Sequence, residues 1–310
     1  MARVSRSPLA LAALASVAVP GLDPVAVGPT AQGGPGFDAA VLTGTDGRRW
    51  VARAPRRPAV AAVVDTEERL LPRLAPLLPV PVPVPAGHCR LKEGGRCVVS
   101  PYLPGVPVDA SALDAGAPLA AEIGRVLAAL HEVDPQVFED AGVPVYEADE
   151  YRLRRLSDVD RAAATGAVPA VLLTRWENAL EQVGQWRFVP TPVHGDLAGD
   201  HVLQNEGRVS ALLHWGEARV ADPADDLAWV VASAPADALD TVLEAYALGR
   251  GDRPDPHLAD RARLAGELSL ARWLLGGVAV DDAAVVDRAT QALARLAERT
   301  STADDDVVPG

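Results

Sequence analysis

Apolar and polar positions alternate with a period of two in the first third of the chain and with a helical period in the rest. The alternation predicts strands, and Asp46-Gly47 between two of them is typical of a tight hairpin turn. One predicted helix, over 60–77, interrupts the strands. The proline-rich run over 79–87 predicts an extended connector, because proline breaks both helices and central strands. The predicted strands cover 24–28, 37–43 and 48–54, with two more on either side of 92–95.

Beyond residue 109 the pattern becomes helical, as in the segment that carries Leu127 and Leu130 on one face. Strands followed by helices predict an α+β fold with a small β-sheet lobe and a larger, mostly helical lobe. We place the sheet lobe at 1–102, a linker at 103–109, the helical lobe at 110–300 and a disordered tail at 301–310. The predicted helices cover 119–133, 151–164, 170–186, 236–248 and 257–275, with a last one ending near Arg299, and short strands at 202–203 and 209–213 interrupt them.

The N-terminal segment has two interpretations. Arg3 and Arg6 followed by an apolar run resemble a signal peptide. Ser7-Pro8 is instead typical of a helix start, with a capping serine and proline at the first helical position, and 9–17 then forms a short apolar helix. We favour the helix, because a strand pattern follows directly. No apolar run reaches the length of a membrane span.

Composition narrows the class of protein. Hydrophobic residues make up 49% of the chain and charged residues 23%, which is enough to build a core. The net charge of −13 argues against nucleic acid as a partner, since nucleic-acid binding needs basic patches. We expect a cytoplasmic monomer that binds a small molecule and no membrane. Cys89 and Cys97 could form a disulfide across a hairpin, and two unlinked buried thiols are the favoured interpretation.

The motif with the most chemical content is HGDLAGDHVL, which starts at His194. Phosphoryl transfer by kinases needs an Asp that orients the attacking hydroxyl, and in protein kinases a metal-binding Asn follows it about five positions later. Asp196 fits the first position, and His201 stands at the second. After a predicted hairpin, His214-Trp215-Gly216 stands where kinases have D-F-G, whose Asp binds magnesium.

These motifs resemble the antibiotic phosphotransferases, the aminoglycoside and macrolide kinases with a protein-kinase-like fold. The resemblance spans about 37–273 and rests on HGDL at 194–197, on D-P-x-x-D-L-A at 222–228 and on LAALHEVDP at 127–135. GDHVL and WGEARVADPADDLAW are most similar to the macrolide 2′-phosphotransferase branch, in which histidine commonly replaces the loop Asn. The resemblance implies Asp196 as catalytic base and Asp226 as the anchor of the loop. We assign His194 to bracing the loop backbone and His131 to packing.

His214 departs from the family pattern, which has Asp there as the main magnesium ligand. Magnesium prefers oxygen ligands, whereas imidazole suits zinc, copper or nickel. The candidate metal ligands are therefore His201, His214 and Asp200, and Glu217 is a further carboxylate that a shifted loop could bring to the metal. Solvated or structural roles for the two acids, and a transition metal held by the histidines, are the alternatives.

The candidate nucleotide site lies in the sheet lobe. Kinases place a phosphate-binding Lys on the third strand and pair it with a helix Glu. Arg53 occupies that position, with Glu67 as its partner, and arginine keeps the charge and offers a fork for phosphate. The alternative is an exposed edge arginine. Phe37 and the glycines at 33, 34 and 36 lie where a nucleotide loop would be. The resemblance implies GTP or ATP as donor with Mg²⁺. Because backbone groups would recognise the nucleobase, the side chains do not distinguish GTP from ATP.

The helices expected to hold the acceptor carry few acids and several large apolar residues, namely Trp176, Trp186, Trp273 and Tyr246. They fit an apolar macrolide better than a polycationic aminoglycoside, and core packing is the simpler account of most of them. The predicted activity is transfer of the γ-phosphate of GTP or ATP to a hydroxyl of a macrolide-like small molecule. Because of His214, this transfer is slow, needs an altered metal or is absent. The alternative is a pseudokinase that binds nucleotide or a hydrophobic ligand without transfer.

Overall fold

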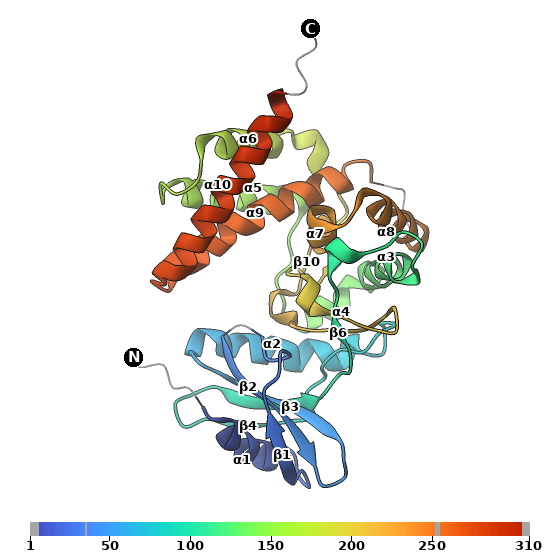
Figure 1. Cartoon of the computed structure of the whole chain (residues 1–310), viewed down its shortest axis with the longest axis vertical. Coiled ribbons are helices and arrows are strands. Elements are labelled where there is room, and N and C mark those ends of the chain that lie inside the picture. The colour runs from blue at the N-terminus through green and yellow to red at the C-terminus, as the bar shows by residue number, and fades with distance from the viewer. Residues whose placement is uncertain (1–5, 35, 252–254, 306–310) are drawn as a thin grey trace.

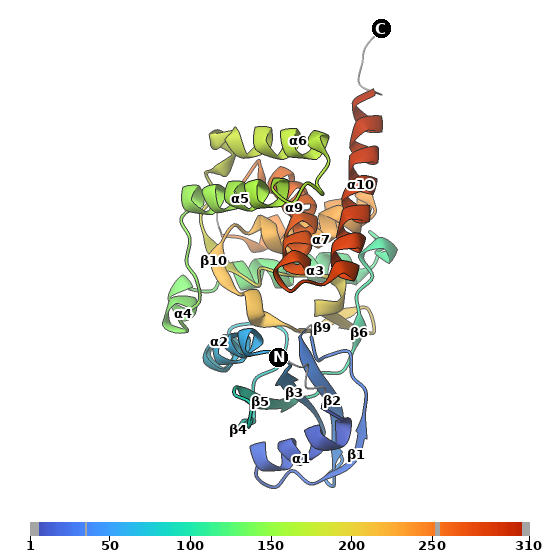
Figure 2. The same cartoon turned by 90° about the vertical axis from the view of Figure 1, so that its left-hand side faces the viewer.

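The chain folds into two lobes, a small antiparallel sheet lobe and a larger helical lobe, as the α+β pattern predicts (Figure 1). The computed structural model describes residues 6–34, 36–251 and 255–305. Helix α2 (Pro58–Leu74) lies on the face of the sheet toward the helical lobe, and α1 (Pro8–Ala18) lies on the opposite face (Figures 1 and 2). The predicted site residues therefore lie where α2 and the sheet meet the helical lobe.

The sheet has five strands in the order β1-β2-β3-β5-β4, with antiparallel neighbours throughout. Gly47 has a φ of 77° in the turn of the β2–β3 hairpin, which explains the predictive strength of Asp46-Gly47. Cys89 and Cys97 face each other across β4 and β5 as free thiols, as predicted. The strands are β1 (Pro24–Gly28), β2 (Phe37–Gly44), β3 (Arg49–Pro55), β4 (Gly87–Arg90) and β5 (Arg96–Pro101).

Helix α1 confirms the helical interpretation of the N-terminal apolar run. The Ser7 hydroxyl accepts a hydrogen bond from the backbone N–H of Ala10 at 3.2 Å, and Pro8 occupies the first turn. Leu11 and Ala15 are buried in a core cluster with residues of the sheet, including Leu42. The apolar character of this segment is therefore used in packing the outer face of the sheet.

The helical lobe contains most of the remaining elements and the two largest core clusters of the described residues. Helix α3 packs against α8, α7 against α9, and α9 against both α5 and α10. Leu70 and Leu74 of α2 share a cluster with Leu127 of α3, which ties the lobes together. The helices are α3 (Pro118–His131), α4 (Pro135–Asp140), α5 (Ala148–Ala163), α6 (Ala170–Glu181), α7 (Ala224–Ser233), α8 (Ala236–Gly249), α9 (Leu258–Ala279) and α10 (Ala283–Asp305).

Two small antiparallel sheets carry the predicted catalytic motif. β6 (Val106–Pro107), β8 (Val202–Asn205) and β9 (Arg208–Leu212) form one, and β7 (Thr191–Val193) pairs with β10 (Arg219–Ala221) in the other. The hairpin between β8 and β9 was predicted. The segment predicted as a plain linker, 103–109, contains β6, which pairs with β8 and so fastens the lobe connection to the catalytic hairpin.

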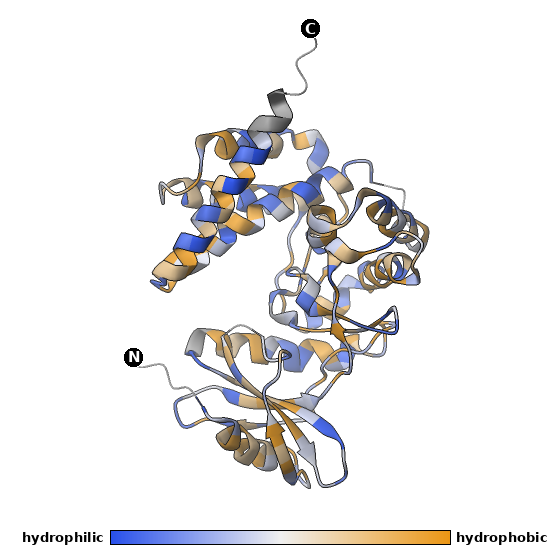
Figure 3. Ribbon diagram, viewed as in Figure 1, coloured by the Kyte–Doolittle hydropathy of each residue, from blue (hydrophilic) through white to orange (hydrophobic). Residues whose placement is uncertain are grey.

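The end of the helical lobe departs from the prediction. Helix α10 continues to Asp305, past the predicted end near Arg299 and into the segment predicted as a disordered tail, of which 306–310 lie outside the described residues. Hydrophilic and hydrophobic residues alternate along α10 (Figure 3), and Ala289 and Leu293 are buried one turn apart. Within the described parts of the chain, no helix is long and apolar enough to cross a membrane.

Candidate active site

The catalytic loop after β7 is fixed by one buried carboxylate. Asp226, in the first turn of α7, accepts hydrogen bonds from the backbone N–H groups of His194 and Gly195, both at 2.7 Å. It also accepts from Nε2 of His131 at 3.2 Å, because an ionised carboxylate has no proton to give. Nδ1 of His131 lies 2.8 Å from the Tyr246 hydroxyl. The predicted anchoring contacts of Asp226 and the packing of His131 are both present.

Gly195 permits the close approach that shapes this loop. Its φ is +82°, and a Cβ built on it would lie 2.4 Å from the carbonyl oxygen of Glu217 and 2.6 Å from Nη1 of Arg219. Side chains cannot occupy that space, so the residue before Asp196 has to be glycine. His194 braces the loop from the other side, donating from Nε2 to the carbonyl of Leu213 at 2.7 Å. Burial lowers the pKa of His194 to about 4, so its imidazole is neutral.

Asp196 extends from this loop with an exposed side chain. The surrounding protein removes part of its hydration and raises the pKa of its carboxyl group, while the positive side chain of Arg272 opposes that shift. A carboxylate with a raised pKa is a better proton acceptor than a free one. The fixed backbone and the open side chain together suit Asp196 to orient a hydroxyl group.

His201 and His214 lie together beside the loop. Their ring centroids are 4.7 Å apart, and Nδ1 of His201 donates to the carbonyl of Asp196 at 2.6 Å. That bond leaves Nε2 of His201 as the nitrogen with a lone pair. His214 has a φ of 65°, a left-handed conformation that Asn, Asp and His adopt more readily than other side chains. Burial, with the charges of His201 and Arg53, lowers the pKa of His214 to about 3.

The donor set beside Asp196 does not fit magnesium. Two imidazoles stand at the positions where kinases use amide and carboxylate oxygens, and magnesium prefers oxygen. Asp200 is largely exposed, and its Oδ1 lies 3.7 Å from Nε2 of His201. Across the described residues, no group of three or more His, Cys, Asp or Glu side chains could hold a metal ion. The roles of His201, His214 and Asp200 as metal ligands stay a prediction.

The sheet lobe places the predicted cation close enough to His214 for their charges to interact. Arg53 is buried and forms an ion pair with Glu67 of α2, and its guanidinium carbon lies 5.0 Å from the centroid of the Phe37 ring. Arg53 is therefore not an exposed edge arginine. The neighbouring acid on α2, Glu68, contacts His88 and Arg96. The glycine-rich turn reaches the other lobe, because a Cβ on Gly34 would lie 2.7 Å from Nδ1 of His214.

A buried ionic network under the loop was not predicted. Asp225 of α7 accepts hydrogen bonds from Arg155, Arg219 and the Tyr151 hydroxyl. Burial opposes ionisation of Asp225, but the two guanidinium groups hold its pKa below the usual range. Arg219 also donates to the carbonyl of Gly195 at 2.8 Å, so the network reaches the catalytic loop. The only sign of this network in the sequence is the pair of adjacent acids in A-D-D-L at 224–227. Their spacing does not show that arginines of α5 and β10 bind Asp225.

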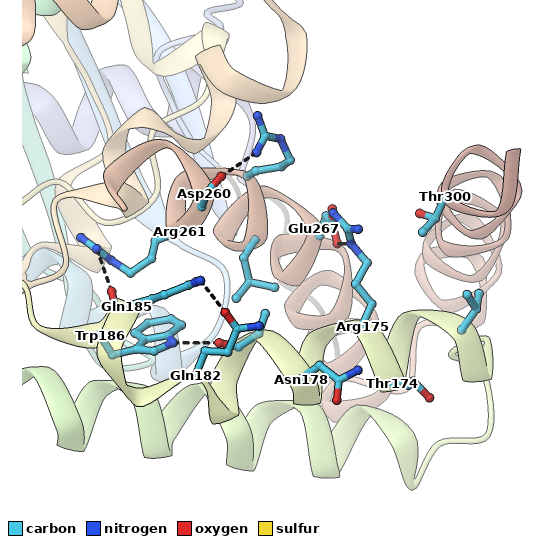
Figure 4. A pocket seen from close by; sticks show the side chains of 14 residues that line it. Thr174, Arg175, Asn178, Gln182, Gln185, Trp186, Asp260, Arg261, Glu267 and Thr300 are labelled. Carbon is cyan, nitrogen blue, oxygen red and sulfur yellow. Dashed lines mark hydrogen bonds and ion pairs between the residues drawn. The ribbon is translucent and has the colours of Figure 1, made fainter. Parts of the chain in front are cut away.

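A large cavity lies away from Asp196, between α6, α9 and α10 (Figure 4). Its volume is about 620 Å³, and the arginines that line it already have carboxylate partners: Arg175 with Glu267, Arg261 with Asp222, and Arg263 with Asp260. Of the predicted apolar acceptor residues, Trp176, Trp186 and Tyr246 are buried in the core, and Trp273 is 39% exposed. Core packing therefore accounts for Trp176, Trp186 and Tyr246, which agrees with the simpler of the two interpretations of these residues.

A kinase-like fold with an Asp on a loop anchored by a second Asp defines a phosphotransferase, and comparison with known proteins agrees. The model of the phosphotransferase enzyme family that is labelled APH matches residues 31–266, so the chain belongs to that family. A protein of Bacillus subtilis strain 168, the uncharacterized YcbJ, is 28% identical over 206 residues. That match covers 62% of this chain and 66%, just under two thirds, of YcbJ.

Solved structures of small-molecule kinases share the fold. The macrolide 2′-phosphotransferase MphH from Brachybacterium faecium is 33% identical, with a TM-score of 0.79 over 92% of this chain and 97% of that one. A type I macrolide 2′-phosphotransferase is 28% identical, with a TM-score of 0.78 over 94% and 98%. The GDP complex of aminoglycoside 2′-phosphotransferase-IIIa is 19% identical with a TM-score of 0.78 over 95% and 100%, a likeness of fold. The expected family is confirmed.

Proposed function

We propose that this chain transfers the γ-phosphoryl group of GTP or ATP to a hydroxyl of a macrolide-like small molecule, with Asp196 as the catalytic base. The carboxylate of Asp196 orients the hydroxyl and takes its proton, the hydroxyl oxygen bonds to the γ-phosphorus, and the nucleoside diphosphate leaves with the electrons of the broken P–O bond. The observation that carries this proposal is the placement of Asp196 on a loop whose two preceding backbone N–H groups are held by Asp226.

The nucleotide would bind between the sheet and the catalytic loop. Arg53 is held in place by Glu67 and supplies positive charge for phosphate, as the corresponding lysine does in kinases. Gly34 brings the glycine-rich turn against His214, so the turn and the histidine face the same space. The choice of a macrolide-like acceptor is supported by the two macrolide 2′-phosphotransferases that are 33% and 28% identical to this chain. GTP and ATP are both candidate donors.

His214 lowers the expected rate of this reaction. A carboxylate ligand contributes a full negative charge to a metal–triphosphate site, whereas the imidazole of His214 is neutral at pH 7 because its pKa is lowered to about 3. No step of the mechanism above is therefore assigned to magnesium. The same observation favours a second function, a pseudokinase that binds nucleotide or a hydrophobic ligand without transfer.

Release of nucleoside diphosphate separates these functions. Natural protein, His214→Asp and Asp196→Asn are each given GTP or ATP, with Mg²⁺ or Mn²⁺, and with or without a panel of macrolides. We expect macrolide-dependent turnover in the natural protein and an increase of at least about 100-fold in His214→Asp, since a carboxylate metal ligand is worth several kcal/mol of transition-state stabilisation. Asp196→Asn should lower turnover by about 10²–10⁴ on either background.

Each outcome of this experiment favours one of the two proposed functions or contradicts both. Turnover only in His214→Asp means that the natural protein is a pseudokinase with an intact acceptor pocket. Nucleotide binding with no turnover in any variant, measured by calorimetry, supports a binding role. If the protein shows neither nucleotide binding nor turnover, both the kinase and the pseudokinase functions are wrong.

A further inference from the structure

A second, smaller cavity lies directly beside the catalytic loop. Its volume is about 160 Å³, and it is bounded by α5, by α9 and by the segment 216–219 that follows His214. Helices α5 and α9 run next to each other in the helical lobe (Figure 2). Four arginines and two carboxylates contribute to the lining: Arg154, Arg155, Arg219, Arg272, Asp158 and Glu217.

The carboxylates around this cavity do not neutralise its arginines. Asp158 is already bonded to Arg161 on the same helix at 3.1 Å, and Glu217 lies 3.7 Å from Arg219. The buried Asp225 is shared by Arg155 and Arg219. Four guanidinium groups therefore face the carboxylates of Asp158, Glu217 and Asp225, and the charge of Asp196 also acts on Arg272. Because Asp158 is bonded to Arg161, which does not line the cavity, positive charge remains in excess, and the low-dielectric walls of the cavity strengthen its potential.

Arg272 and Arg154 have no carboxylate partner among the residues that the structure describes. Arg272, on α9, is partly buried and makes no hydrogen bond or ion pair there. Burial and the nearby positive charges of Arg155 and Arg219 lower its pKa. Arg154, on α5, is exposed and lies 5.2 Å from the Tyr146 ring centroid. A guanidinium placed among others costs free energy unless an anion compensates it, and the larger cavity, whose arginines are all paired, shows no such excess.

We propose that this cavity is an acceptor subsite for an anionic oxygen group, a carboxylate or a phosphate, that binds Arg272 and Arg154 while a hydroxyl of the same molecule reaches Asp196. The inference rests on the proposed phosphoryl transfer with Asp196 as base, and it replaces the macrolide-like acceptor by one that carries an acidic group. The cavity adjoins the reacting position, because Arg219 lines it and also donates to the carbonyl of Gly195, the residue before Asp196. Polycationic acceptors are repelled from the same place.

Anion binding can be measured without catalysis. Titration calorimetry with inorganic phosphate, and separately with glucuronate, compares the natural protein with Arg272→Gln and with the control Arg263→Gln. Arg263 lies on the same helix, about 14 Å along its axis, and lines the larger cavity. We expect Arg272→Gln to weaken both ligands by about tenfold, as the loss of one charge-assisted contact does, and Arg263→Gln to leave them unchanged. Equal affinity in the two variants overturns the subsite.

Phosphoryl transfer to a matched set of sugars identifies the acceptor charge. Glucuronate, glucose and glucosamine offer similar hydroxyls with negative, neutral and positive substituents. The His214→Asp background supplies turnover, and we expect glucuronate to have the lowest KM and to lose that advantage in Arg272→Gln. Equal KM values for the three sugars overturn the inference and leave the kinase assignment standing. Arg272-dependent anion binding without transfer to any acceptor supports the subsite and refutes the kinase. A preference for phosphate over glucuronate identifies a phosphorylated acceptor rather than a carboxylic acid.

Discussion

At the residue scale, Gly195 decides whether Asp196 can stand where it does. The glycine has a φ of +82°, and its missing side chain leaves room for the Glu217 carbonyl and for Arg219. Gly195→Ala adds a methyl group that has to displace one of them, and it also carries the cost of a left-handed conformation. We expect a loss of about 2–4 kcal/mol in the free energy of unfolding, measured by urea denaturation. Gly184→Ala, where no atom lies within 4 Å, is the control and should change stability by less than about 0.5 kcal/mol.

Asp196 itself gives the prediction that separates chemistry from folding. Its side chain is exposed and no hydrogen bond of its carboxylate holds the described fold together, so Asp196→Asn should leave the thermal midpoint nearly unchanged. Turnover in the His214→Asp background should fall by about 10²–10⁴, the range for loss of a general base. The two readouts are kcat and the unfolding midpoint. A fall in both together would assign Asp196 to structure.

The sequence reveals some site residues and hides others for a physical reason. Asp196, His201 and His214 belong to one local motif, whose spacing follows from the loop and hairpin that carry them. Arg53 and Glu67 were found as a pair because the strand and helix that hold them are consecutive. Arg272 lies 76 positions after Asp196, on a helix with no motif of its own. Only packing of α9 on α5 brings it to the loop, and no periodicity specifies which arginine remains unpaired.

At the element scale, Asp225 joins three separate segments under the loop. Arg155 comes from α5, Arg219 from β10 and the carboxylate from α7. Asp225→Ala leaves two buried guanidinium groups without their shared partner, and breaking a buried pair costs about 3–5 kcal/mol. We expect a loss of that size in urea denaturation. Asp158→Ala, which breaks a surface pair on α5, should cost at most about 0.5 kcal/mol. Similar losses in the two variants would mean that the network does not hold these elements together.

Elements were predictable where local signals are strong. The β2–β3 hairpin follows from Asp46-Gly47, and α1 follows from Ser7-Pro8. Strand β6 was missed because its two residues, Val106 and Pro107, carry no periodic signal, and it exists only because β8 pairs with it. Helix α10 was predicted too short because its polar end resembles a tail in composition. Pairing with β8 determines β6, and continuation of the preceding helical turns determines the end of α10; composition alone predicts neither.

At the scale of the whole molecule, folding places two imidazoles in surroundings that exclude their charged form. Burial lowers the pKa of His194 to about 4 and that of His214 to about 3, against about 6.5 in an unfolded chain. The unfolded state therefore binds more protons between these values. The stabilisation from each group is fully present above pH 6.5 and is lost as the pH falls toward the folded pKa. For the fully buried His194 the loss is roughly 2 kcal/mol by pH 5.

Carboxylates also change stability with pH: the raised pKa of Asp196 makes the folded state bind more protons, which stabilises it as the pH falls. Comparing the pH dependence of two variants removes this contribution, because both variants keep Asp196. Urea denaturation at pH 7.5 and pH 5 compares the natural protein with His214→Asn and with His257→Asn, which removes a histidine outside the cluster. We expect the drop in stability between the two pH values to shrink by about 1 kcal/mol in His214→Asn, less than for a fully buried group because His214 is partly exposed. An equal drop in all three proteins would mean that the His214 imidazole keeps its ordinary pKa, and the cleft would then present a protonatable cation to nucleotide phosphates near pH 6.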